Sequence, residues 1–325
     1  MIVTMTEFEL IRRYFAAARC AQPRKDIALG LGDDCALLTP RPSEQLAIST
    51  DTLTAGVHFP EVCDGFLLGQ RALAVSASDL AAMGAEPLGF TLALTLPEVD
   101  AYWLERFAQG LDHMAAACGL ALIGGDTTRG PLSLTLTVFG SVPQGQALTR
   151  AGAQPGDLLC VGGAPGEAGG ALPFVLGQRH ERGAYVDTLM ARYWSPAPQF
   201  ELGLALRGRA TAALDISDGL LADCGHISAA SSVKLIIENE RLPVSPALAA
   251  LFEPEQIRML AMSAGDDYLL AFTLPARHLK ALQADFPQVG VIGRVASGQG
   301  IQVQDAIGRD VTPLRGGYQH FAMKP

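Results

Sequence analysis

Aspartates recur along the chain within short stretches of small and turn-forming residues. These stretches read GLGDDCALL, ISTDTLTAGVHF, AVSASDLAAMGA, LIGGDTTRG, ALDISDGL and SAGDDYLL. The aspartates that they contain are Asp33, Asp34, Asp51, Asp79, Asp126, Asp215, Asp218, Asp266 and Asp267. We expect most of them at the end of a strand or in the turn after it, where α/β proteins commonly bind ligands.

Asp79 occupies an informative position in an expected helix. On a helix over residues 66–84, which could be capped by Asp64, the side chains of Val75, Asp79 and Met83 share one face. A carboxylate between two apolar residues needs a partner or a metal ion. No Lys or Arg lies one turn away on that face, so we expect a cation supplied from elsewhere.

The aspartates also have structural interpretations when they are taken singly. Asp33, Asp126 and Asp218 could form turns or cap helices, and Asp51 could simply end a strand. Convergence would favour metal binding, because two charges about 4 Å apart repel by about 4 kcal/mol at an effective dielectric constant of about 20. Carboxylates with the hydroxyls of Ser49 and Thr50 suit Mg²⁺ rather than Zn²⁺, and Mg²⁺ bound to carboxylates and phosphates is typical of phosphoryl transfer.

The overall charge excludes one class of partner. The net charge is −9, and the lysines and arginines are scattered without the basic stripe that nucleic-acid binding requires. Bridging Mg²⁺ ions would allow such an acidic protein to bind phosphates.

Cysteine spacing and the N-terminal sequence indicate a cytoplasmic protein. The six cysteines include no Cys-x-x-Cys pair, so we expect reduced thiols rather than disulfides or a zinc site. The first residues do not resemble a signal peptide, and Thr6 and Glu9 have the spacing of a helix capping box. No apolar run reaches the roughly 18–20 residues of a membrane span.

Helical and strand patterns alternate along the 325 residues, which predicts an α/β or α+β fold in two domains. The polar, turn-rich segment 146–157 suggests a boundary, giving domains of residues 1–148 and 149–325. Helices are expected at 7–20, 66–84, 101–118, 167–178, 199–208, 218–230 and 277–285. Strands are expected at 34–38, 46–52, 88–96, 120–124, 132–141, 158–162, 212–216, 233–238, 268–274 and 289–296.

Other motifs give weaker signals. The sequence has neither a P-loop nor the protein-kinase motifs. The glycine-rich stretch 162–170 could be a flexible loop before a helix, or its helix N-terminus could attract phosphate. His58 follows a Gly-Val turn and could contact a substrate, whereas His113 and His226 fit structural roles. Arg150 could bind a phosphate or merely solvate a loop.

Taken together, these motifs resemble the thiamine-monophosphate kinase family. The resemblance rests on GLGDDCALL, ISTDTLTAGVHF, ALAVSASDLAAMGAEP, LTLPEVDAYWLE, LIGGDTTRGPLSLTLTVFG, ALTRAGAQPGD and DISDGLLADCGHI, which span nearly the whole chain in order. It implies a homodimer formed through the N-terminal domains, and an ATP-dependent conversion of thiamine monophosphate to thiamine diphosphate assisted by several Mg²⁺ ions. The C-terminal domain would complete the nucleotide and substrate site.

The resemblance also implies roles for particular residues. The metal-binding set would be Asp34, Ser49, Thr50, Asp51, Asp79, Asp126, Asp215 and Asp218. ATP would contact Gly125, Asp126, Arg150 and Ser217, and the acceptor would contact His58, Asp266 and Arg315. None of these residues is assigned as an acid or base, because an acceptor phosphate oxygen is already deprotonated near neutral pH.

Two departures from the family pattern lie on the acceptor side. The family usually has Glu where this chain has Asp266, and often has Trp where this chain has Arg315. These changes leave open a related enzyme of the same superfamily with a different acceptor. A nucleotide-binding relative that has lost catalysis, and an α/β protein whose aspartates only form caps and turns, are further alternatives.

Overall fold

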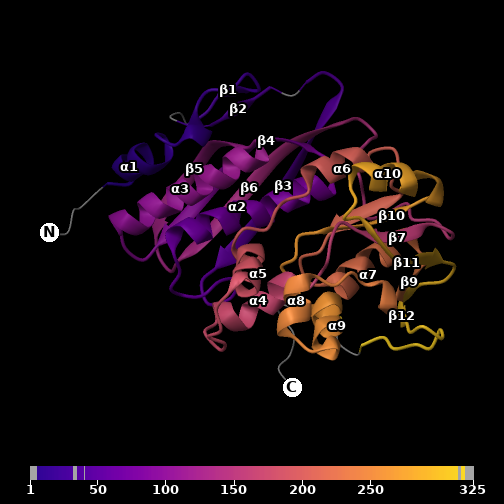
Figure 1. The fold of residues 1–325 in the computed structure, drawn as a ribbon. Coiled ribbons are helices and arrows are strands. Elements are labelled where there is room, and N and C mark those ends of the chain that lie inside the picture. Colours follow the sequence, from indigo (N-terminus) through magenta and orange to yellow (C-terminus); the bar gives the residue numbers. More distant parts are fainter. Residues whose placement is uncertain (1–5, 32–34, 40, 314–315, 319–325) are drawn as a thin grey trace. The chain divides into compact units, whose positions relative to one another are not determined.

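The computed structural model describes residues 6–31, 35–39, 41–313 and 316–318. The chain divides into two compact units (Figure 1). The first unit comprises Met1–Leu80 and Ala85–Gly145, and the second comprises Ala81–Gly84 and Gln146–Pro325. Each unit combines a mixed β-sheet with helices, so the predicted α/β class is confirmed.

The first unit is built on a sheet of four long strands in the order β3-β6-β4-β5. These strands are β3 (Glu44–Thr54), β6 (Ser133–Pro143), β4 (Glu86–Leu96) and β5 (Ala121–Arg129). The pairs β3/β6 and β6/β4 are antiparallel, and β4/β5 is parallel. β5 continues five residues beyond its predicted end, so Asp126 lies inside a strand and not in the turn after it. Asp51 likewise lies inside β3.

Two helices pack on one face of this sheet. α2 (Gly65–Ala82) begins after Asp64, which accepts the N–H of Leu67 at 3.2 Å as the sequence predicts. α3 (Ala101–Cys118) begins and ends at the predicted residues. The two helices cross at glycines, since a Cβ at Gly69 would lie 2.4 Å from the backbone oxygen of Phe107.

The N-terminal segment differs from its predicted form. The Thr6–Glu9 capping box is present, with the Thr6 N–H 2.8 Å from the Glu9 carboxylate and the Glu9 N–H 3.4 Å from the Thr6 hydroxyl. The prediction of a single helix over 7–20 is wrong. The segment is divided into α1 (Glu7–Leu10), a π-helical turn (Ile11–Phe15) and a 3₁₀ turn (Arg19–Ala21). A small hairpin follows, of β1 (Ile27–Leu29) and β2 (Leu37–Leu38).

The second unit contains a six-stranded sheet in the order β12-β9-β11-β7-β10-β8. Its strands are β7 (Leu158–Val161), β8 (Ala212–Asp215), β9 (Lys234–Glu238), β10 (Leu270–Leu274), β11 (Gly290–Ala296) and β12 (Gly300–Gln304). Neighbouring strands are antiparallel except β12 and β9. The carboxyl ends of β7, β8, β9 and β12 therefore lie at the same edge of the sheet as the amino ends of β10 and β11.

Helices fill the connections of this unit. They are α4 (Glu167–Val175), α5 (Ala184–Trp194), α6 (Phe200–Leu206), α7 (Leu220–Ser231), α8 (Pro246–Leu251), α9 (Pro254–Ser263) and α10 (Leu279–Asp285). Sequence patterns anticipated α4, α6, α7 and α10, but not α5, α8, α9 or β12.

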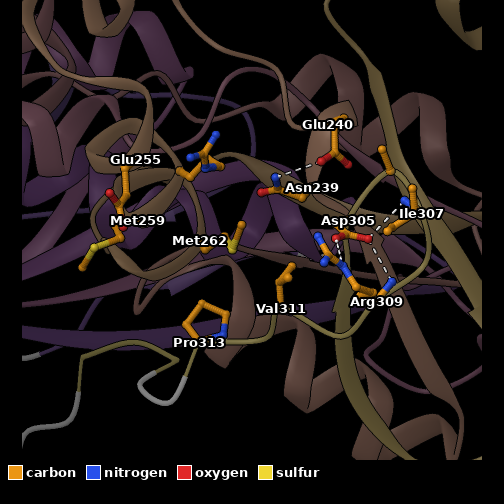
Figure 2. A pocket seen from close by; sticks show the side chains of 12 residues that line it. Asn239, Glu240, Glu255, Met259, Met262, Asp305, Ile307, Arg309, Val311 and Pro313 are labelled. Carbon is orange, nitrogen blue, oxygen red and sulfur yellow. Dashed lines mark hydrogen bonds and ion pairs between the residues drawn. The ribbon is translucent and has the colours of Figure 1, made fainter.

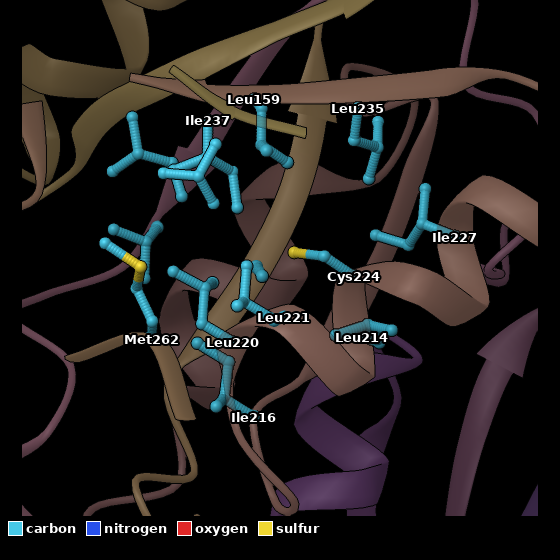
Figure 3. Close-up of a cluster of buried hydrophobic side chains, with 14 of the residues drawn as sticks. Leu159, Leu214, Ile216, Leu220, Leu221, Cys224, Ile227, Leu235, Ile237 and Met262 are labelled. Carbon is cyan, nitrogen blue, oxygen red and sulfur yellow. The ribbon is translucent and has the colours of Figure 1, made fainter. Parts of the chain in front are cut away.

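Strand alternation separates two apolar clusters in this unit. Leu159 belongs to a cluster with residues of α7 and α9, such as Leu220 and Met262 (Figure 3). The adjacent Cys160 belongs to the other cluster, with residues of α6 and α10. Helices therefore cover both faces of the sheet, and only its edges are left for the loops that could form a site.

Among the described residues, no helix is both long and apolar enough to cross a membrane.

Candidate active site

Three of the predicted metal-binding residues meet between a strand and a helix of the first unit. Ser49 and Asp51 are two residues apart on β3, so they face the same side of the sheet. The Ser49 hydroxyl donates a short hydrogen bond to the carboxylate of Asp79 on α2. Asp51 is close enough to Asp79 for the two carboxylates to repel each other.

Asp51 is held in a setting that is unfavourable for its charge. Burial raises its pKa to about 6, and the nearby Asp79 carboxylate adds to the increase, while a hydrogen bond from Ser76 opposes it. One of its oxygens, Oδ2, is buried with no hydrogen-bond partner in the described structure. A buried acceptor without a donor is costly unless something else occupies the position.

This arrangement fits a hard cation. Two carboxylates and a hydroxyl offer only oxygen ligands, which Mg²⁺ prefers, and a divalent ion would remove both the repulsion and the unsatisfied oxygen. Among the described residues, no group of three or more Asp, Glu, His or Cys side chains gathers closely enough to hold a metal alone. Further ligands would have to come from substrate phosphates, or from residues that do not lie beside Asp51 and Asp79 in this structure.

The Thr50 hydroxyl does not join this cluster. Strand alternation places it on the opposite face of the sheet, where it lies 2.9 Å from the Thr137 hydroxyl of β6. Thr52 makes the same kind of contact with Thr135, at 2.8 Å. Within the chain, the Thr50 hydroxyl therefore faces away from Asp51 and Asp79, and its place in the metal-binding set remains a prediction.

Asp126 also lies apart from the cluster within the chain. The strand register pairs Asp126 with Ala93, Ala93 with Thr135 and Thr135 with Thr52. Asp126 is thus three strand spacings, about 14 Å, from β3, and it faces the side of Thr52 rather than that of Asp51. Its side chain is exposed. The preceding Gly125 is required by packing, because a Cβ there would lie 2.1 Å from the Leu92 backbone oxygen.

His58 lies just beyond the end of β3. Its Nδ1 accepts the N–H of Thr54 at 3.0 Å, which places the ring proton on Nε2. The surrounding turn is closed by a hydrogen bond from the Gly56 N–H to the Phe59 oxygen, at 2.8 Å. These contacts fix the imidazole at the same end of β3 as Asp51.

In the second unit, the predicted residues lie at the carboxyl end of β8. Asp215 ends the strand and is buried, and Ser217 and Asp218 follow in the loop before α7. Asp223, which was not predicted, holds this loop. Its Oδ2 accepts the N–H groups of Ser217, Asp218 and Gly219, each at 3.0 Å.

Asp223 is itself buried under this loop. Burial raises its pKa to about 6, an increase that the backbone N–H groups oppose and the charge of Asp218 assists. The sequence contained a signal for this role, because an aspartate one turn inside a helix can reach back to the N–H groups at its start. The motif DISDGLLAD places Asp223 in that position.

Asp266 and Asp267 lie beside this loop, just before β10. The Asp266 N–H donates to the Ser217 oxygen at 2.8 Å, and its carboxylate accepts the Tyr268 hydroxyl at 3.2 Å. Asp267 points elsewhere: its carboxylate accepts the N–H of Gly166 at 2.6 Å and that of Ala168 at 3.4 Å. Burial raises the pKa of Asp267 to about 7, although both N–H groups act in the opposite direction.

This contact decides between the two interpretations of the glycine-rich stretch 162–170. Gly166 precedes the first residue of α4, and its N–H is one of the groups that a bound phosphate would use. A carboxylate of the chain already occupies this helix N-terminus. The stretch is therefore a loop docked on its neighbour and not a free phosphate site.

The remaining predicted residues are less informative. Arg150 is exposed, and its guanidinium has no partner among the described residues; only its backbone oxygen is bound, by Ser231 at 3.0 Å. Asp34 and Arg315 lie outside the described residues. Three residues after Arg315, Tyr318 donates its N–H to the Asp218 backbone oxygen at 2.9 Å, so this residue contacts the loop after β8.

A cavity of about 540 Å³ opens at the same edge of this sheet, near the ends of β9 and β12 (Figure 2). Its lining includes Met259, Met262 and Ile307. Asp305 there is paired with Arg309 at 2.7 Å, so its charge is already compensated. The cavity is lined by none of the residues predicted from the sequence, and it lacks paired carboxylates comparable to Asp51 and Asp79.

Comparisons with known proteins agree with the geometry. Residues 32–142 match the family described as AIR synthase related protein, N-terminal domain. The chain is 46% identical over 323 residues to a thiamine-monophosphate kinase of Escherichia coli K12, covering 97% of this chain and 98% of the relative.

Solved structures give the same result. A crystal structure of thiamine-monophosphate kinase from Stenotrophomonas maltophilia K279a has a TM-score of 0.81 and 48% identity, covering 86% of this chain and 92% of the other. A structure described as AaThiL complexed with AMPPCP and TMP has a TM-score of 0.78 and 30% identity, covering 87% and 89%. With sequence similarity over almost its whole length, this chain belongs to the thiamine-monophosphate kinase family.

Proposed function

We propose that the protein phosphorylates thiamine monophosphate with ATP, giving thiamine diphosphate and ADP. The observation that carries this proposal is the Ser49–Asp79–Asp51 arrangement, with its unsatisfied buried oxygen, in a chain so similar to named thiamine-monophosphate kinases. The relative described as complexed with AMPPCP and TMP supports the same pair of substrates.

We propose metal-binding residues in each of the two units. Asp51, Asp79 and Ser49 would hold Mg²⁺ in the first unit, and Asp215 and Asp218 in the second. Mg²⁺, when bound, supplies positive charge that offsets the charge of the phosphates. The family resemblance adds Asp34 and Asp126 to this set, and assigns Gly125, Arg150 and Ser217 to ATP.

The protein's own residues act by binding and orientation. His58 presents an Nε2–H donor, which suits a phosphate oxygen of the acceptor, and Asp266 carries a negative charge, which suits the cationic ring of thiamine. Arg315 completes the proposed acceptor contacts. Transfer occurs in line between the two bound phosphates, and no side chain needs to accept a proton, since the attacking oxygen is already ionised near pH 7.

We also infer a homodimer formed through the sheet of the first unit. The sheet face opposite α2 carries Ile48, a residue that is 59% exposed, together with Leu46 and threonines of β3 and β6. An exposed apolar patch on a regular sheet is typical of a protein interface. The six free cysteines, three of them buried, suit the reducing cytoplasm.

The decisive experiment incubates purified protein with Mg²⁺, ATP and thiamine monophosphate, and separates the products by chromatography. Equal amounts of thiamine diphosphate and ADP are expected, and neither should form with EDTA or with unphosphorylated thiamine as acceptor. ADP formation with another phosphorylated acceptor alone would assign the protein to a different reaction of its superfamily. ATP binding without turnover would identify a non-catalytic relative.

A further inference from the structure

The half-buried Asp267 connects two loops of the second unit, at the edge of the sheet where β8 ends. Asp267 precedes β10, and its oxygens accept the N–H groups of Gly166 and Ala168 at the start of α4, about a hundred residues earlier in the chain. The loop lies very close to its neighbour here, since a Cβ at Gly166 would be 2.7 Å from the backbone nitrogen of Ala261. The loop at Gly166 therefore packs too closely against α9 to shift without a clash.

Gln199 forms a second bridge between the same two segments. Its amide nitrogen donates to the Gly162 oxygen at 2.8 Å, and its amide oxygen accepts the Leu270 N–H at 2.8 Å. The loop from 162 to 168 is thus fastened at both ends to the segment 263–270. Neither bridging residue belongs to the set that the family resemblance assigns to metal, ATP or acceptor.

The residues on both sides of Asp267 need such support. Asp266 has φ 68° and Tyr268 has φ 51°, a left-handed conformation that residues with a side chain rarely adopt. Such conformations persist where surrounding contacts hold them, and they concentrate at functional sites. The N–H groups of Asp266 and Tyr268 donate to the oxygens of Ser217 and Ile216, each at 2.8 Å.

We propose that Asp267 is a positioning residue for phosphoryl transfer, which fixes Asp266 on the acceptor side by anchoring the segment 263–270 to the glycine-rich loop. This inference rests on the proposed function for its kinetic consequence. Its structural content, that Asp267 orders its two neighbours, is independent of which substrate is used.

The proposal makes a selective prediction. The loop of Ser217 and Asp218 has its own anchor in Asp223, so the loss of Asp267 should leave nucleotide binding largely intact. On the acceptor side, Gln199 holds the segment only at its end, through the Leu270 N–H, so Asp267 is the side chain that holds Asp266 from its immediate neighbour in the chain. The KM for thiamine monophosphate should therefore increase far more than the KM for MgATP.

Asp267→Asn is the direct test, because asparagine has the same shape but cannot accept both N–H groups. Asp157→Asn is a matched control. Asp157 is a buried aspartate that accepts the Gln154 N–H at 2.9 Å and the Thr211 hydroxyl at 2.7 Å, and it precedes β7 at the opposite edge of the sheet. The two substitutions should lower thermal stability comparably, which separates positioning from general destabilisation.

For Asp267→Asn we expect the acceptor KM to rise at least tenfold, with the MgATP KM within twofold of wild type. Asp157→Asn should leave both within twofold. Equal kinetic effects of the two variants, or a larger change in the MgATP KM, would overturn the proposal. If Asp267→Asn does not fold, Gln199→Ala takes its place, with an expected three- to tenfold rise in the acceptor KM alone; no rise would overturn the proposal.

Hydrogen exchange provides the readout that does not depend on turnover. In Asp267→Asn, amides of the segment 263–270 should exchange at least tenfold faster than in wild type, and those of Asp157→Asn should not. Unchanged exchange refutes positioning even if the kinase is active. A wild-type protein inactive with thiamine monophosphate, combined with the expected exchange difference, refutes the proposed function but supports the role of Asp267.

Discussion

The hydroxyl of Ser49 donates to the carboxylate of Asp79, thirty residues later in the chain, and so joins β3 to α2. The bond holds Asp79 beside Asp51, although the two carboxylates repel each other. Burying a charge next to a like charge is unfavourable for folding. A protein that retains such a pair has a use for it, and binding of a cation between phosphates supplies one.

The first prediction concerns Asp79→Asn, which should separate activity from stability. Turnover should fall at least a hundredfold, because a charged ligand is lost. The metal-free protein should nevertheless become more stable at pH 8, by about 1–3 °C in melting temperature, because the repulsion on Asp51 is relieved. Calorimetry in EDTA and a product assay with Mg²⁺ measure the two effects.

The pH dependence of this gain has a definite sign. The pKa of Asp51 in the folded protein, about 6, lies above its ordinary value of 3.8, so the folded state is penalised once the unfolded chain ionises. Removing the Asp79 charge makes this penalty smaller. The resulting gain in stability should have its full size above pH 7 and should diminish as the pH falls from 7 towards 4. A variant that loses stability at pH 8 but keeps wild-type turnover would contradict the metal-ligand role.

The second prediction uses two adjacent hydroxyls. Ser49→Ala removes the donor to Asp79 and should lower turnover about tenfold or more. Thr50→Val removes a hydroxyl on the opposite face, whose partner is Thr137, and should change turnover less than threefold. Initial rates at saturating substrates provide the comparison, and both variants keep the backbone of β3. A larger loss of turnover in Thr50→Val than in Ser49→Ala would show that the Thr50 hydroxyl takes part in the active site.

The difference between Ser49 and Thr50 shows what the sequence could supply. A strand over 46–52 was predictable from composition, and its period of two already places neighbouring side chains on opposite faces. Asp126 was harder to place, because GGDTTRG has the composition of a turn. Strand alternation places Asp126 and Thr128 of this continuation on the face that α2 and α3 do not cover, where a sheet tolerates polar residues.

Tertiary contacts explain what the sequence could not supply. Asp267 stands out in the sequence within SAGDDYLL, but its partners Gly166 and Ala168 are about a hundred residues away. The helix α9 did carry local signals, a capping box formed by Glu253 and Gln256 and a proline at its first position, which the sequence prediction missed. Local signals fared better: the Thr6–Glu9 capping box and the Asp64 cap both form as predicted.

The third prediction concerns the anchor of the nucleotide-side loop. Asp223→Asn weakens three N–H contacts to one oxygen, and should lower stability by about 1–3 kcal/mol. Because Ser217 and Asp218 lose their support, the MgATP KM should rise about tenfold, with the acceptor KM changed less than threefold. Rates at varied ATP and Mg²⁺ measure this.

This pattern is the reverse of that expected for Asp267→Asn, so the two variants serve as controls for each other. An acceptor KM that rises as much as the MgATP KM in Asp223→Asn would show that the two anchors do not act separately.

The fourth prediction tests the proposed dimer surface. Ile48→Asp places a charge on the uncovered face of the first sheet, next to the threonines of β3 and β6, and burying it in an interface would be costly. The variant should sediment as a monomer, whereas the wild type sediments as a dimer. Val244→Asp, at a 49% exposed apolar residue of the second unit, is the control and should remain dimeric. A monomeric wild type would refute the dimer, and a dimeric Ile48→Asp variant would place the interface elsewhere, since an unpaired aspartate at the centre of a closely packed sheet interface is not tolerated.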